Sequence, residues 1–197
     1  MVYPELRGSA LPDISKELDL SLRHLQAELS RVDILIRRET RRWQMAGQDP
    51  GDAFRGLYIS DEEVQALLSR PLATSWGQTV VLPAAEEQMF VQAYHNACQN
   101  AQSLVEHAHS VGVQPRLEQL AQTFGLDRFD IDVLLICLAP AMDLRYERLY
   151  GYLQDDVTRK RPSIHLVLTL LADPGPARLL KLSHFAVSAP LLRHRLV

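Results

Sequence analysis

The sequence predicts a mainly α-helical protein, with a long antiparallel helical hairpin followed by a bundle of short helices and a small strand component. Two long segments carry apolar residues at alternating intervals of four and three, which is typical of helices that pack along a narrow seam. After Gly112 the chain changes to short apolar segments separated by glycine and proline, which is typical of short helices and turns. The predicted regions are an extended arm at 1–12, a hairpin with a short intervening helix at 13–112, and a further domain at 113–197.

The first long helix is predicted from Asp13, whose side chain suits the N-cap position, to about Ala46, since Gly47 follows. Its apolar side chains form one heptad series, with Ser15 and Glu39 as the interruptions. The members of this series are Leu11, Leu18, Leu22, Leu25, Leu29, Val32, Ile36 and Trp43. An apolar stripe this narrow requires a partner helix.

The second long helix is predicted from Pro83 to Gly112, after a short helix that ends before Pro71 and an extended segment at 74–82. Its own heptad series consists of Phe90, Tyr94, Ala97, Ala101, Leu104, Ala108 and Val111. The two matched series favour a hairpin within one chain, in which Leu25 and Leu29 face Ala97 and Ala101. An intermolecular coiled coil is the alternative.

Turn and cap residues divide the rest of the chain. The predicted segments are helices at 116–124, from Asp127, from Asp143 to about 154 and from Ser163 to 172, then a short helix and a strand at 191–196. The helix after Asp127 is apolar on nearly all sides, so its central residue Leu135 is expected at the core. Short helices, a glycine turn, a basic loop and a terminal strand resemble a winged helix-turn-helix.

Composition indicates a soluble globular protein, with 47% apolar and 23% charged residues. No apolar run approaches the ~20 residues that span a bilayer, and no secretory leader opens the chain. Cys98 and Cys137 lie among apolar or small neighbours, as buried thiols do in a reducing compartment. We therefore expect a cytoplasmic protein with no membrane contact. The net charge of −3 argues against a dedicated nucleic-acid binder.

Motifs for catalysis are missing from the sequence. Its nine glycines are scattered, and neither a phosphate-binding loop nor a nucleotide fingerprint nor a nucleophile elbow is present. His107 and His109 would face different sides of a helix, and His95 with Cys98 offers only two of the three or four ligands that a metal needs. We expect no catalytic, cofactor-binding or metal-binding residue in this chain, and hence no enzyme activity.

Basic residues are the candidates for contact with a partner. The helix dipole favours arginine in the second half of the first long helix, and an acidic partner is the alternative explanation. The basic loop, Arg159 to Arg161, lies where a wing could reach a phosphate backbone, but carboxylates of the same domain would repel DNA. Protein contact is therefore favoured over nucleic acid. The candidate partner surface consists of Arg31, Arg38, Arg42, Arg159, Lys160 and Arg161.

The stretch 117–171 resembles a winged-helix-like N-terminal region of certain bacterial AAA-type ATPases, some of which are encoded with contractile injection systems. The residues that carry the resemblance are Leu120, Phe124, Leu126, 129–140, Asp143, Arg145, Tyr146, 149–156 and 161–163. The segment 189–191 with Arg193 is similar to the exit segment of that region, and the resemblance is looser over the hairpin. Ala141 departs from the family pattern, which has an acidic residue nearby.

The resemblance implies a non-catalytic module that recruits a protein substrate or adaptor to an ATPase core following residue 197. The apolar end of the chain, 191–197, agrees with a continuation. ATP and Mg²⁺ would bind in that core, and the parent protein would form a homo-oligomer, a hexamer in the family.

Two other functions stay open. One is a stand-alone winged-helix DNA-binding regulator that dimerises through the long helices, and the other is a scaffold for helical assembly. A DNA reader should show polar side chains on its recognition helix, whereas 144–154 is rich in tyrosine and leucine.

Overall fold

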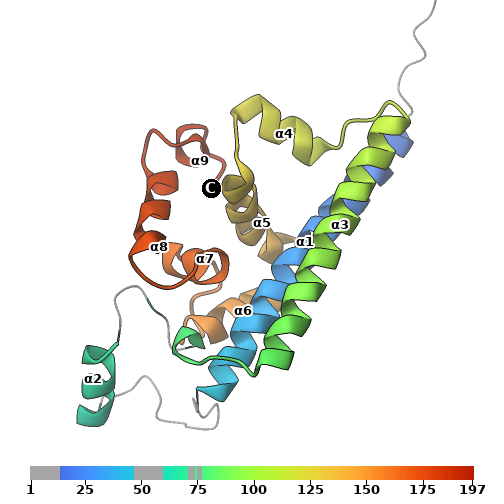
Figure 1. Cartoon of the computed structure of the whole chain (residues 1–197). Coiled ribbons are helices and arrows are strands. Elements are labelled where there is room, and N and C mark those ends of the chain that lie inside the picture. The colour runs from blue at the N-terminus through green and yellow to red at the C-terminus, as the bar shows by residue number, and fades with distance from the viewer. Residues whose placement is uncertain (1–13, 47–59, 71–73, 75–76) are drawn as a thin grey trace, which may run out of the picture.

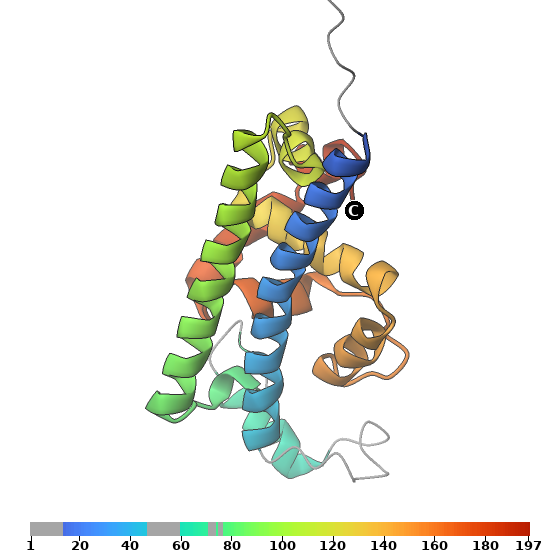
Figure 2. The same ribbon diagram turned by 90° about the vertical axis from the view of Figure 1, so that its right-hand side faces the viewer.

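The computed structural model describes residues 14–46, 60–70, 74 and 77–197. Helices α1 (Ile14–Met45) and α3 (Ala84–Ser110) form a long antiparallel hairpin, and the shorter helices gather on one side of it (Figure 1). Figure 2 shows α1 between α3 and α6. The predicted fold class, mainly α with a long hairpin and short helices, is confirmed. The predicted arm at 1–12 and the Asp13 cap lie outside the described residues.

Several short elements begin or end at residues that the sequence predicts, although Asp143 is the C-cap of α5 and Leu144, not Asp143, is the N-cap of α6. They are α2 (Asp61–Leu68), η1 (Gly77–Thr79), α4 (Arg116–Phe124), α5 (Arg128–Met142), α6 (Arg145–Leu153), α7 (Ile164–Leu171), α8 (Pro176–Leu180), η2 (Lys181–Phe185) and α9 (Pro190–Arg193). Gly125 ends α4 with φ of 64°, a left-handed conformation that glycine adopts without strain. Asp127 and Asp130 form a reciprocal capping box on α5, and the Ser163 hydroxyl accepts from Leu166 N at 3.2 Å.

The strand component was wrong: none of the described residues is in a strand. Pro190 begins helix α9 instead, as its fixed φ favours the first helical turn, and it places Leu191 in the core. The expected extended segment at 74–82 contains the 3₁₀ turn η1, closed by Val80 N donating to Gly77 O at 3.1 Å. Gly77 allows this turn to lie close to α1, since a Cβ there would be 2.6 Å from Trp43 Cδ1.

From Leu25 onward, the apolar series of α1 packs against the short helices and not against α3, whereas Leu18 and Leu22 are exposed. Leu29, Val32 and Ile36 belong to a core cluster shared with α4, α5, α6 and α7, and among the described residues this cluster takes none from α3. The hairpin was therefore predicted correctly, but the expected pairing of its two apolar series was wrong. The short helices supply the other buried apolar side chains of this cluster, so Leu29, Val32 and Ile36 are buried against them.

A second face of α1 meets α3. Ala101 and Ala108 are buried at the predicted series of α3, and the α1 face toward α3 carries arginines bonded to α3 side chains. Helix α1 therefore packs against α3 on one face and against the helices after residue 113 on another, and it joins these two parts of the chain.

Helix α5 lies at the centre of this core. Leu135 and Ile136 have no exposed surface, and the Tyr150 hydroxyl of α6 donates to Ile136 O at 2.8 Å. The expectation that Leu135 marks the core is confirmed. Over the described part of the chain, no helix combines the length and apolar character needed to cross a bilayer.

Candidate functional site

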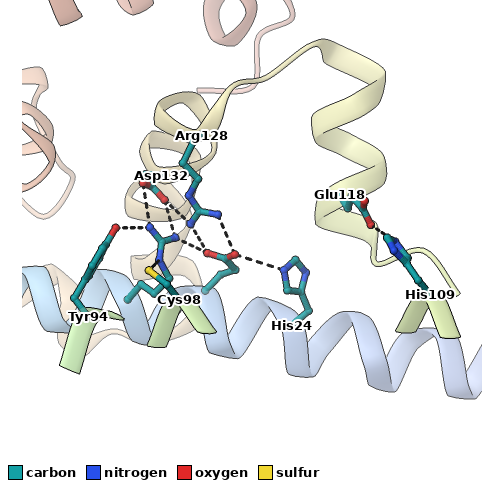
Figure 3. A network of polar contacts seen from close by, with 9 residues as sticks. His24, Tyr94, Cys98, His109, Glu118, Arg128 and Asp132 are labelled. Atoms are coloured by element: carbon teal, nitrogen blue, oxygen red, sulfur yellow. Dashed lines mark hydrogen bonds and ion pairs between the residues drawn. The ribbon is translucent and has the colours of Figure 1, made fainter. Parts of the chain in front are cut away.

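A buried polar junction joins α1, α3 and α5 (Figure 3). At its centre is Arg31, whose side chain is 4% exposed. Its Nη1 donates to Asp132 Oδ1 at 3.0 Å and to Glu28 Oε2 at 2.6 Å. Toward α3, its Nη2 donates to the Tyr94 hydroxyl and its Nε to Cys98 Sγ at 3.2 Å. One guanidinium therefore connects three helices.

Arg128 supplies a second guanidinium from the first turn of α5. Its Nη1 donates to Glu28 Oε1 at 3.0 Å and its Nη2 to Asp132 Oδ1 at 2.9 Å. His24 Nε2 lies 3.5 Å from Glu28 Oε1 on the far side. Two carboxylates are thus paired with two guanidinium groups, as burial of charge requires.

Burial changes the acid–base properties of the junction. Removal from water raises the pKa of Asp132 from 3.8 to about 6, against the opposing effect of Arg31. Burial also raises the pKa of Tyr94. For Arg31, burial acts to lower the pKa, but the carboxylates of Asp132 and Glu28 outweigh it and raise the pKa. The junction holds its ions through mutual pairing, and its geometry serves to fix three helices in register.

The predicted partner residues of α1 bind within the chain. Arg31 is at the buried junction, so its expected place on a surface was wrong. Arg38 and Arg42 both bond to Glu87 of α3, and Arg41 binds Glu86 with Nε–Oε2 of 2.8 Å. Cross-hairpin ion pairing thus accounts for these arginines more directly than the helix dipole does.

The basic loop is exposed and lies between α6 and α7. The Gln154 side chain shapes it, donating to the carbonyls of Arg159 and Arg161 at 3.3 and 3.0 Å and accepting from Ser163 N at 3.0 Å. Arg159 Nε lies 3.1 Å from an Asp156 carboxylate oxygen, and Lys160 Nζ lies 3.3 Å from Glu147 Oε2. Because α3 and α6 lie on opposite sides of α1, the six predicted residues do not form one surface (Figure 2).

Two carboxylates and one histidine come together at the start of α5. His184 Nδ1 lies 2.9 Å from Asp130 Oδ1, and Asp127 Oδ2 lies 3.9 Å from His184 Nε2. Three potential ligand atoms come together here. Asp130 and Asp127 already form the capping box of α5, so their contacts with His184 connect η2 to the start of α5. The absence of a metal site stays a prediction.

Sequence reasoning missed the partners of Arg31. Tyr94 and Asp132 are distant from Arg31 along the chain, Glu28 is three residues away on the same helix, and the three do not form a recognisable motif. One signal was present: Asp132 interrupts the apolar run of α5, where an ionised side chain needs a partner.

Fold and site together define a helical module whose hairpin and central helix α5 are joined by a buried ion network. The family model described as a winged helix domain, variant, matches residues 19–197. The chain belongs to this family, and the matched residues include both the hairpin and the short helices. No curated protein and no solved structure matches the chain.

Proposed function

We propose that this chain is a non-catalytic protein-interaction module that recruits a protein substrate or adaptor to an AAA-type ATPase core. The observation that carries the proposal is the internal pairing of its basic side chains. Arg38 and Arg42 bind Glu87, and Lys160 binds Glu147. Cations paired in this way are poorly available to phosphates, whose neutralisation dominates DNA affinity.

Exposed apolar side chains offer a surface of the opposite kind. Leu180 is 76% exposed, and Leu179, Leu182 and Val187 are exposed nearby in the chain. Large exposed apolar side chains that lie together are typical of protein contact. They favour a protein partner over a nucleic acid.

The alternative is a DNA-binding regulator, which the winged-helix family and the exposed basic loop favour. Against it, α6 buries Tyr146, Tyr150 and Leu153, so much of this helix serves packing. Specific reading of bases requires polar side chains that reach the groove.

The ATPase part of the proposal depends on the resemblance of 117–171 and 189–193 to N-terminal regions of such ATPases. In that protein, ATP and Mg²⁺ would bind in the core, and the assembly would be a homo-oligomer. Calorimetric titration of this chain with Mg-ATP should give no saturable heat, and binding at micromolar concentration would contradict the proposal.

Fluorescence anisotropy with random duplex DNA separates the two functions. We expect no saturable binding at physiological salt. Submicromolar binding that weakens steeply with added salt would overturn the proposal and favour the regulator. Photo-crosslinking from position 180 in native cells should give protein adducts, with the α3 position Gln99, also exposed, as the control.

A further inference from the structure

We propose that a groove between the hairpin and α5, α7 and η2 binds a short acidic peptide segment of the partner protein, with apolar side chains of the peptide in the groove. This inference rests on the proposed function and names its partner class. The groove has a volume of about 470 Å³ and lies where α7 and η2 approach α1 and α3. That volume is within the range of about 300–1,000 Å³ typical of ligand sites, and suits a few side chains of a peptide.

Apolar side chains from four helices line this groove. They are Leu35 of α1, Phe90 and Val91 of α3, Phe129 of α5, and Leu170 and Leu171 of α7. Val91 is 57% exposed, so part of this surface is in contact with water. Covering it with apolar side chains of a ligand would remove that surface from water, which is favourable.

The charge of the groove selects an acidic ligand. Four cations line it, Arg38, Arg42, Arg128 and Lys181, with two carboxylates, Asp132 and Asp173. Arg38 and Arg42 are paired with Glu87, and Arg128 is paired with Glu28 and Asp132, so Lys181 is, of the lining cations that the structure describes, the one left to bind a ligand. Complementary charge increases both the association rate and the specificity of a peptide that carries carboxylates beside its apolar residues.

Lys181 is the cation best placed for such a peptide. Its Nζ lies 5.0 Å from the centre of the Phe129 ring, and within the described residues no carboxylate pairs with it. A peptide carboxylate can therefore bind this ammonium group without displacing an existing ion pair. Phe129 would meanwhile present its ring to an apolar neighbour of that carboxylate.

An unpaired hydroxyl in the same groove also points to a polar ligand. Thr169 is 7% exposed and lines the groove, and its hydroxyl has no hydrogen-bond partner in the part of the chain that the structure describes. Nε of Arg38 and of Arg42 are likewise unpartnered there. A peptide backbone offers both donors and acceptors to such groups. Duplex DNA fits less well, because a phosphate backbone has no apolar side chains with which to cover the apolar lining of the groove.

The test uses two fluorescein-labelled peptides of equal length, one of alternating glutamate and leucine and one of alternating lysine and leucine. Fluorescence anisotropy should show saturable binding of the acidic peptide only. Lys181→Glu and Val91→Glu should each weaken this binding at least about fivefold, as expected for loss of a charge or apolar contact. The matched controls, Lys16→Glu and Val157→Glu at exposed positions outside the groove, should stay within about twofold.

Three results would overturn the inference: equal affinity for the two peptides, insensitivity to both groove substitutions, or duplex DNA binding that Lys181→Glu abolishes. Thermal melts of all four variants establish that each is folded. The first two results would leave the proposed function standing if position 180 still crosslinks to protein and DNA does not bind. DNA binding would remove both.

Discussion

Arg31 and Asp132, 101 residues apart in the chain, form a buried ion pair with Nη1–Oδ1 of 3.0 Å that joins the hairpin to the central helix α5. Glu28 and Arg128 complete the charge balance around this pair. Because both ions are removed from water, each depends on the other for compensation. The pair therefore links the position of α1 to the fold of the short helices.

Removal of one member of this ion pair should destabilise the folded protein. Arg31→Leu leaves Glu28 and Asp132 with Arg128 as their one remaining guanidinium partner in the junction, so we expect a loss of about 3–5 kcal/mol in the free energy of unfolding. The control Arg37→Leu removes an exposed pair with Asp33 and should cost under about 1 kcal/mol. Urea denaturation of the three proteins measures both values. Equal effects for the two substitutions would show that the junction does not stabilise the fold.

The raised pKa of Asp132 predicts a pH dependence of stability. The folded protein retains the carboxyl proton up to about pH 6, whereas the unfolded chain releases it near 3.8. The contribution of Asp132 to stability is therefore largest at low pH and falls as pH rises from about 4 to 6, by roughly 3 kcal/mol at most.

The measurement is the difference in unfolding free energy between the wild type and Asp132→Asn across this range, since asparagine does not titrate. We expect this difference to fall as pH rises and to level off above about pH 7. The same measurement on Asp156→Asn should give a difference that changes with pH in the opposite direction, because hydrogen bonds from Thr158 lower the pKa of Asp156. A difference for Asp132 that rises with pH would contradict the predicted shift.

Ala101 tests the close approach of α3 to α1. It is buried at this interface, so Ala101→Leu should overpack the hairpin and cost about 1–3 kcal/mol. Ala93→Leu, at an exposed position of the same helix, is the matched control and should be nearly neutral. Thermal melts at protein concentrations that span about a hundredfold range also test whether the chain forms oligomers. A melting temperature that rises with concentration, and more so in the variant, would indicate an intermolecular coiled coil.

Leu135 tests the centre of the core. It has no exposed surface, so Leu135→Ala should cost about 2–5 kcal/mol through lost burial and a cavity. Leu144→Ala removes the same atoms from an exposed side chain and should change stability by less than about 0.5 kcal/mol. Chemical denaturation compares the two variants. A cost for Leu135→Ala under about 1 kcal/mol would contradict its central position.

Local signals explain how much of the fold was predictable. Gly125 ends α4 at the expected residue, and Asp127 and Ser163 cap α5 and α7 as expected. Such caps depend on neighbours in sequence, so one sequence is sufficient to find them. The terminal strand failed because strand formation requires a partner strand, whereas Pro190 favours a helical turn by itself.

The candidate site was less predictable, for a physical reason that the arginines illustrate. An arginine in a sequence is equally compatible with an exposed surface and with a buried pair, since either environment can satisfy its charge. Arg31 is buried and Arg161 is exposed, although both were candidates for the same surface. Their environments depend on helices that the sequence does not place.

By itself the sequence determined the two long helices, the short helices α4 to α7, the hairpin and the apolar stripe of α1, because these follow from spacing and from local backbone preferences. Only the tertiary structure decided which neighbour each face of α1 meets. Leu29 and Ile36 pack against the short helices, while Arg38 on another face binds Glu87 of α3. Apolar burial is non-directional, so the apolar stripe of α1 must be buried, but the stripe does not specify which helices bury it. The pairing of ions across long sequence separations then fixes the arrangement.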